Sequence, residues 1–251
     1  MTNKAVLALL IFSLSTAASP QEPKPAQRQG SVTVSAGISK EQLALEDQLN
    51  AILLHADEFL RNGNAIEAIK QYESALDFVH KQSLLGEQKS RVMQKLARGY
   101  VIGNRAPDAV LIYSDLLAEK KPHCQSESTT DTDCASLQYS LGQAQINALD
   151  FQGALSSFQS AEANYAKAAK LTEIHEITMV DLKDQAQAKT YIAVALFRLG
   201  KTAEAVTTIK AAIPLLESVQ SDENLQISIR DDAKRSLKEA NTVLAHLQSV
   251  Q

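Results

Sequence analysis

The sequence predicts an all-α protein, a solenoid of antiparallel helix pairs. From residue 39 onward, apolar side chains recur at the spacing of an amphipathic helix, and no convincing alternating strand pattern is present. Turn formers are scarce: 251 residues contain 9 Gly and 6 Pro, whereas a β-sandwich or barrel needs a turn about every 8–12 residues. One spacing of small and large residues also repeats four times. Together these observations favour a helical repeat.

Composition excludes two broad classes of protein. With 45% hydrophobic and 22% charged residues, the chain can bury a core, so it is not disordered throughout. Lys and Arg number 25 against 29 Asp and Glu, which gives a formal net charge of −4. This balance lacks the basic excess that is typical of nucleic-acid binding. We therefore expect no nucleic-acid partner.

The first 18 residues have the features of a secretory signal peptide. Lys4 supplies a positive charge, an apolar run covers 5–18, and small side chains stand at Thr16 and Ala18. The run is shorter than the roughly 20 residues that span a bilayer as a helix. We expect cleavage after Ala18 and a periplasmic or secreted location; an uncleaved membrane tether is the alternative. Residues 19–39, rich in proline and polar side chains, are expected to form a flexible leader.

The first helix pair is expected to begin at residue 39. Ser39 and Gln42 match a capping box, in which each side chain bonds the backbone near the other, so a helix is predicted from there toward Arg61. Gly63 and Asn64 predict a turn, because both residue types tolerate turn conformations. A second helical period follows the turn.

Three further pairs and a last helix follow. The stretches 154–170 and 178–199 are each long enough to run past a short repeat helix. The segment 226–248 is amphipathic and is predicted to cap the open face of the last pair. The predicted organisation is a signal peptide at 1–18, a leader at 19–39 and a repeat domain at 40–251, with units at about 50–82, 91–120, 136–170 and 185–218.

The repeat rests on three constant spacings. In each unit, 12 residues separate a small residue of the first helix from an Ala of the second, a large apolar residue follows 4 later, and Ala or Leu another 3 later. Small residues let two helices approach closely, and large ones fill the groove between them. The four sets are Ala56, Ala68, Tyr72 and Ala75; Ala97, Ala109, Tyr113 and Leu116; Gly142, Ala154, Phe158 and Ala161; Ala193, Ala205, Ile209 and Ala212.

This pattern resembles the tetratricopeptide repeat over roughly residues 50–217. The family period is about 34 residues, but successive units here begin 41, 45 and 51 residues apart, so longer helices or loop insertions are expected. Gln138, Gln145 and Lys189 stand where the family usually has large apolar residues. The resemblance implies a superhelix with a concave surface that binds a partner protein or peptide.

Motifs for catalysis, cofactors and metals are incomplete. Gly200-Lys-Thr202 matches the end of a phosphate-binding loop, but Ala195 replaces the required earlier glycine. His175-Glu176 begins like a zinc-protease helix, but Met179 replaces the second histidine ligand. We therefore predict no catalytic residues, no cofactor and no metal site.

The two cysteines predict a disulfide. Cys124 and Cys134 flank a polar insertion between the second and third units, and two cysteines in an exported chain indicate a bridge. A metal or redox pair is the alternative, but neither a third ligand nor a redox spacing is present.

In the family that the pattern resembles, certain first-helix positions line the concave surface. When these positions are mapped onto this chain through the constant spacing, they predict a groove lined by first-helix side chains. The set includes Ile146 and four arginines opposed by Asp57, and Tyr139, Ile146 and Phe197 are expected to be exposed in it. Arginine beside apolar side chains is a mixture that interfaces favour. The predicted partner-binding residues are Arg61, Arg91, Arg98, Tyr139, Asn147, Phe197 and Arg198.

The leading hypothesis is an exported, non-catalytic scaffold for protein–protein interaction in envelope assembly or secretion, with a partner segment of acidic character. Two alternatives remain open: an accessory helical domain of a cell-wall enzyme, and a structural protein that associates with itself through the capping helix or the open first face.

Overall fold

The computed structural model describes residues 40–84, 86–124 and 132–250, without the side chains of residues 122 and 123. The predicted signal peptide at 1–18, the leader at 19–39 and the Ser39 cap lie outside these residues. Within them, all regular structure is helical. The helices are α2 (Lys40–Arg61), α3 (Ala65–Lys81), α4 (Glu87–Ile102), α5 (Ala106–Cys124), α6 (Asp133–Asn147), α7 (Phe151–Leu171), α8 (His175–Arg198), α9 (Thr202–Ser221) and α10 (Ile227–Ser249).

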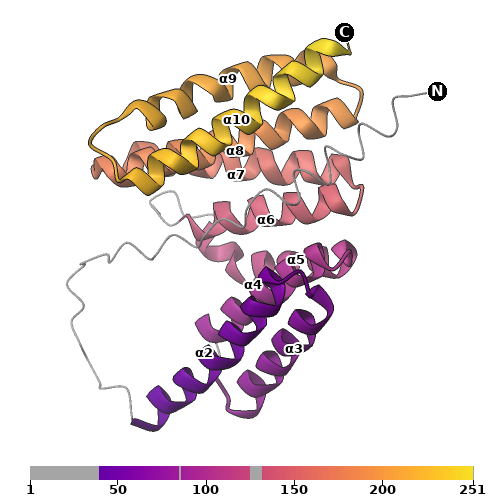
Figure 1. The fold of residues 1–251 in the computed structure, drawn as a ribbon, viewed down its shortest axis with the longest axis vertical. Coiled ribbons are helices and arrows are strands. Elements are labelled where there is room, and N and C mark those ends of the chain that lie inside the picture. Colours follow the sequence, from indigo (N-terminus) through magenta and orange to yellow (C-terminus); the bar gives the residue numbers. More distant parts are fainter. Residues whose placement is uncertain (1–39, 85, 125–131, 251) are drawn as a thin grey trace.

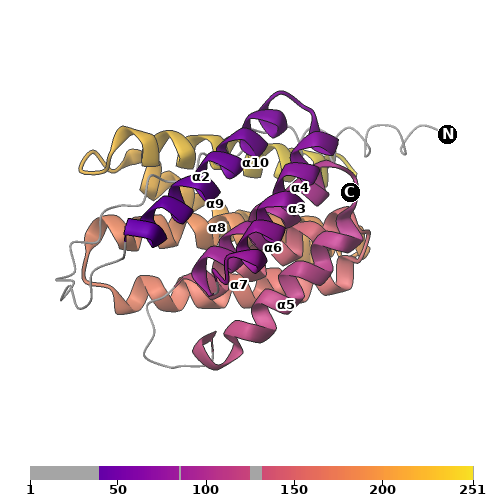
Figure 2. The same cartoon turned by 90° about the horizontal axis from the view of Figure 1, so that it is seen from below.

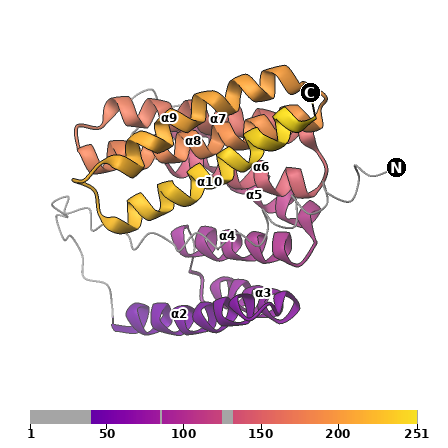
Figure 3. The same cartoon turned by 45° about the horizontal axis from the view of Figure 1, so that its top comes forward.

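The helices form four antiparallel pairs and a final single helix. Each helix packs against the one that follows it, and α10 packs against both α9 and α8. Figures 1 and 3 show the resulting stack, with α2 and α3 at one end and α9 and α10 at the other. Seen from below, α2 and α10 lie on one side of the stack, and α5 and α7 on the other (Figure 2). The predicted all-α solenoid is confirmed.

The residues of the repeated spacing form the centre of each pair. All sixteen are buried, and among them Ala56 and Ala68 in the first unit and Phe158 in the third are 0% exposed. At Gly142 of α6 the close approach is extreme, because an added Cβ would lie 2.8 Å from two atoms of the Phe158 ring. The spacing therefore encodes helix contact, as expected from small residues facing large ones.

Capping side chains begin some of the helices, and glycines with positive φ follow the ends of others. The side chains of Asn64 and Asp150 cap α3 and α7 by accepting from backbone N–H groups three residues later, at 3.2 and 2.9 Å. Gly63 and Gly200 have φ of 76° and 79°, which glycine adopts without steric cost. Each of these residues lies in the turn that joins the two helices of a pair.

Long helices contribute to the irregular period. The helices α7 and α8 contain 21 and 24 residues. All of α7 and most of α8 lie between Gly142 and Ala193, the most widely separated pair of successive small residues. The last helix, α10, runs from Ile227 to Ser249, one residue later at each end than the predicted 226–248. No helix in the described part of the chain is long and apolar enough to cross a bilayer.

Candidate functional site

Side chains of successive first helices meet across one face of the stack. Arg91 Nη2 of α4 lies 2.7 Å from Asn50 Oδ1 of α2, and Gln187 Nε2 of α8 lies 2.6 Å from Ser236 Oγ of α10. These contacts join the first helices α2 and α4, and the first helix α8 to the terminal helix α10. Tyr191 of α8 is also hydrogen-bonded to Gln143 of α6, the first helix before it. The face that the first helices share, here called the first-helix groove, is the candidate site.

The N-terminal half of the groove is charged and open. Lys95 Nζ of α4 lies 2.9 Å from Asp57 Oδ2 of α2, and the Tyr72 hydroxyl donates to the other oxygen of Asp57. Arg61 is exposed, and its Nε lies 3.4 Å from the Asp57 carbonyl oxygen. The Asp57 carboxylate therefore pairs with Lys95, a residue that the sequence analysis did not include in the groove.

Arg98 lies near the boundary between the second and third units. It is half-buried, and it is close enough to Tyr113 to act on the titration of that phenol. Burial raises the pKa of Tyr113 to about 12, against the opposing effects of a Ser140 hydrogen bond and of the Arg98 guanidinium. Arg91 is exposed. The two arginines of α4 thus present positive charge on the groove.

In the C-terminal half, aromatic packing replaces the expected exposed surface. The Tyr139 ring is half-buried and makes edge contacts with Phe158 and Tyr191, at centroid distances of 5.5 and 5.6 Å. Ile146 is 8% exposed and belongs to the core cluster that contains Leu155. The expectation of an exposed Ile146 was wrong, because the close approach of α6, α7 and α8 encloses this side chain.

The helix α10 adds an acidic group to the aromatic cluster. Glu239 is hydrogen-bonded to Tyr191, and burial raises the pKa of this carboxyl group. Burial likewise raises the pKa of Tyr139 well above its ordinary value, and Glu239 contributes to that increase. Glu239 thus bonds the Tyr191 phenol directly and acts on the Tyr139 phenol by its charge.

The remaining predicted groove residues are partly engaged within the fold. Phe197 is half-buried with its ring perpendicular to His246 of α10, at 5.5 Å. The Arg198 guanidinium lies over the Phe151 ring, 4.4 Å from its centroid. Asn147 Nδ2 donates to the Gln143 carbonyl oxygen at 2.8 Å. These residues lie on the first helices, and each has a neighbour in the same chain.

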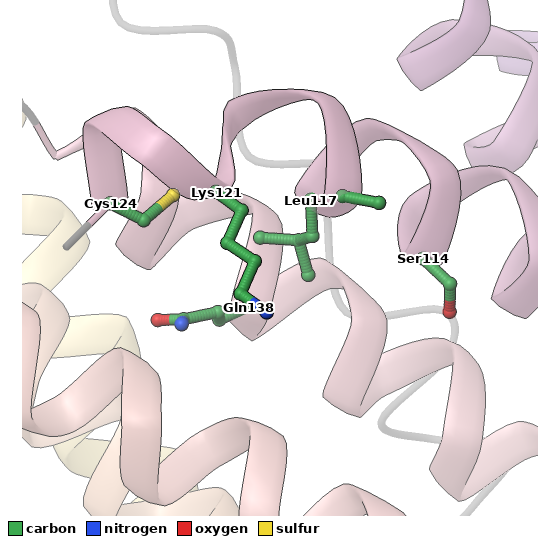
Figure 4. A pocket seen from close by; sticks show the side chains of 6 residues that line it. Ser114, Leu117, Lys121, Cys124 and Gln138 are labelled. Carbon is green, nitrogen blue, oxygen red and sulfur yellow. The ribbon is translucent and has the colours of Figure 1, made fainter.

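A concavity lies between α5 and α6, away from the first-helix groove. It has a volume of about 410 Å³ and is lined by Leu117, Lys121 and Cys124 of α5 and by Gln138 of α6, among others (Figure 4). Cys124 forms a disulfide with Cys134, with Cα atoms 5.6 Å apart. The bridge ties the end of α5 to the beginning of α6 and forms part of the wall of this concavity.

The sequence motifs that suggested chemistry have structural roles. His175 Nε2 lies 2.6 Å from Asp222 Oδ2, and Glu176 accepts a hydrogen bond from Gln226 at 2.8 Å. The pKa of Asp222 is lowered, first by the Asn224 backbone N–H and then by His175. These contacts fasten the start of α8 to the segment that joins α9 to α10. Among the described residues, no group of three His, Cys, Asp or Glu side chains is placed to hold a metal ion.

Solved structures with the same arrangement of helices are repeat proteins. TPR-like repeats of a Podosopora anserina kinesin light chain match with a TM-score of 0.55 and 18% identity, covering 81% of this chain and 95% of that one. Yeast Hif1, a histone chaperone described as a scaffold protein recruiting protein complexes to core histones, matches with a TM-score of 0.56 and 13% identity, covering 83% and 98%. BtubC from P. vanneervenii matches with a TM-score of 0.50 and 15% identity, covering 83% and 81%.

Searches by sequence found no counterpart: no protein-family model and no curated protein matches the chain. At identities below 20%, the structural matches establish the fold alone. The four helix pairs, their constant buried spacing and these matches agree with one another. The chain therefore has the fold of a tetratricopeptide-like repeat solenoid.

Proposed function

We propose that this protein is an exported, non-catalytic scaffold that binds a partner protein or peptide in the first-helix groove. The observation that carries the proposal is the charged, open half of that groove, where Arg61, Arg91 and Arg98 come from two neighbouring first helices. Arginine forks bind carboxylates in two-point geometry, so a segment with acidic side chains fits this half.

The C-terminal half supplies apolar surface. Its predicted residues are Tyr139 and Phe197, whose rings are half-buried, with Asn147 and Arg198 on the same two helices. Half-buried aromatic rings of this kind are common anchors in interfaces. A bound segment is expected to place acidic residues over α4 and apolar residues over α6 and α8.

Export and a role in envelope assembly or secretion complete the proposal. They are supported by the signal-peptide features of residues 1–18 and by a cysteine pair that suits an oxidising compartment. The periplasm or the extracellular space would then be the site of action.

The test is a charge reversal in the groove. The full chain is used as bait for affinity capture, with crosslinking, from native envelopes. The captured partner proteins are then quantified for the parent chain and for an Arg98→Glu/Arg198→Glu variant. Loss of desolvated charge pairs costs about 2–5 kcal/mol, so capture should fall well over tenfold while helicity by circular dichroism stays unchanged.

A matched control makes the same change of charge outside the groove. Lys210 on α9 and Lys234 on α10 are exposed, so Lys210→Glu/Lys234→Glu should leave capture intact. Capture that is unaltered in the arginine variant would place the binding site elsewhere, for instance at the concavity beside Cys124.

A further inference from the structure

Each first helix has four positions that face the unit before it. Relative to the small residue of the repeat, they lie five, two and one residues before it and two residues after it. The outermost positions are buried in every later unit. The position five before holds Val92, Leu137 and Ala188, with exposures of 0, 2 and 0%. The position two after holds Gly99, Ala144 and Ala195, all buried.

Contacts show what covers these positions. At the position two before, Lys95 pairs with Asp57, Ser140 is hydrogen-bonded to Tyr113, and Tyr191 is hydrogen-bonded to Gln143. Each partner belongs to the preceding unit. An added Cβ at Gly99 would lie 3.3 Å from a ring atom of Tyr72 on α3, so the second helix of the preceding unit occupies this face.

In the first unit the same four positions are open. They hold Ala51, Leu54, His55 and Glu58, which are all exposed, with Leu54 at 65%. Earlier on the same side of α2, Leu43 is 53% exposed and Asp47 is exposed. We call these six residues the end face; α2 and α3 form that end of the stack (Figure 3).

The opposite end of the stack has a different character. The outward side of α10 is polar, as repeat proteins require of a terminal cap. Its exposed residues include Lys234, Arg235, Lys238, Asn241 and Thr242. The end face instead combines two exposed leucines with two carboxylates. It is therefore not polar throughout, as the outer side of a cap is.

We propose that the end face docks an amphipathic, basic helix of a partner protein, in the place that a preceding second helix would take. Apolar side chains of that helix would cover Leu43 and Leu54, and Lys or Arg would lie opposite Asp47 and Glu58. A second copy docking through the same face would bring like carboxylates together, which is unfavourable. This surface is separate from the first-helix groove, and the proposal does not depend on the function proposed for that groove.

The probe for the test comes from the chain itself. In the stack, α7 packs against α8 as a second helix against a following first helix. Among the four second helices, α7 has a positive formal charge, with Lys167 and Lys170 against Glu162, whereas the other three are negative. A stapled, fluorescent peptide of the α7 sequence with Glu162→Lys therefore presents an apolar stripe beside basic side chains.

Anisotropy titration of this peptide with the full chain should give saturable binding that weakens with salt. Leu54→Glu and Glu58→Lys in the chain should each weaken binding at least tenfold. The matched control is Ile66→Glu: Ile66 is 71% exposed on α3, and its counterparts Pro107, Gln152 and Ala203 are also exposed, so neighbouring units do not cover that position. This variant should bind as the parent does.

Three results would overturn the proposal. They are absence of saturable binding, binding that Leu54→Glu leaves unchanged, and an equal loss with Ile66→Glu. Sedimentation of the chain alone provides a further outcome. If its mass grows with concentration and Leu54→Glu abolishes that growth, a second copy is the occupant and the partner helix is excluded.

Discussion

Adding one methyl group at Gly142 tests the close packing of the third unit. A glycine inside a helix ordinarily costs about 1 kcal/mol relative to alanine, so Gly142→Ala would stabilise an isolated helix. Here the new Cβ would lie 2.8–2.9 Å from three atoms of the Phe158 ring. That ring is 0% exposed and is held between Tyr139 and Tyr191, so it has no room to move aside.

The magnitude follows from two opposing effects. Overpacking a filled core costs about 1–3 kcal/mol, and the enclosed ring places this site near the upper end of that range. After subtraction of the gain in helix propensity, the net loss of unfolding free energy is about 2 kcal/mol. For a chain of this size, such a loss lowers the Tm by roughly 4–8 °C.

The assay is urea unfolding followed by circular dichroism at the helix band, with Gly99→Ala as the matched control. At Gly99 the nearest atoms to an added Cβ are at 3.3–3.4 Å, so the tighter contact and the gain in propensity should nearly cancel. Combining Gly142→Ala with Phe158→Leu should cost less than the sum of the single changes, because the shorter side chain relieves the contact. A Gly142→Ala variant as stable as Gly99→Ala would refute this account of the packing.

Three further predictions concern the disulfide, a buried acid and the N-terminus. Reduction of the Cys124–Cys134 bridge, which closes a separation of 10 residues, should cost about 2–3 kcal/mol and lower the Tm without unfolding the chain; two reactive thiols in oxidised native protein would contradict it. Burial raises the pKa of Glu239, so the parent should lose stability as pH rises from the ordinary value of 4.5 through the raised one. Glu239→Gln should flatten that dependence in urea unfolding at several pH values, and parallel curves would exclude the effect. Mass spectrometry of the exported protein should find a mature N-terminus near Ser19, and an intact Met1 would disprove cleavage.

The fold could be predicted from the sequence because its main contact is periodic. Small residues such as Ala56 and Gly142 recur at one distance from the alanines that they face, and this relation survives changes in helix length. The predicted cap at Ser39 lies outside the described residues, in which the first helix begins at Lys40. The lengths of α7 and α8 were indicated by their apolar periods, and the structure has them as single helices.

The groove could be predicted only in part. A position in the repeat fixes the side of the helix on which a side chain lies, but it does not reveal which other helix packs against that side. The side of α6 on which Ile146 lies is buried by α7 and α8, which the spacing alone does not reveal. Contacts from Glu239 and His246 could not be foreseen either, because α10 lies outside the repeat pattern. Lys95 had a signal that was missed: a lysine two residues before Ala97 stands at a position that faces the preceding unit.

The two halves of the groove differ in how much of their binding capacity is already used within the chain. The Arg198 guanidinium rests on Phe151, and the Tyr139 ring is packed against two other rings. Arg91 has a neutral partner, the Asn50 amide oxygen. Both guanidinium groups keep their full charge, but three of the predicted arginines (Arg61, Arg91 and Arg98) lie in the N-terminal half and one (Arg198) in the other. An incoming carboxylate therefore gains more over α4 than over α8. On the proposed function, electrostatic attraction brings the acidic part of a partner segment to the N-terminal half first. The half-buried rings of Tyr139 and Phe197 in the other half then supply apolar contact.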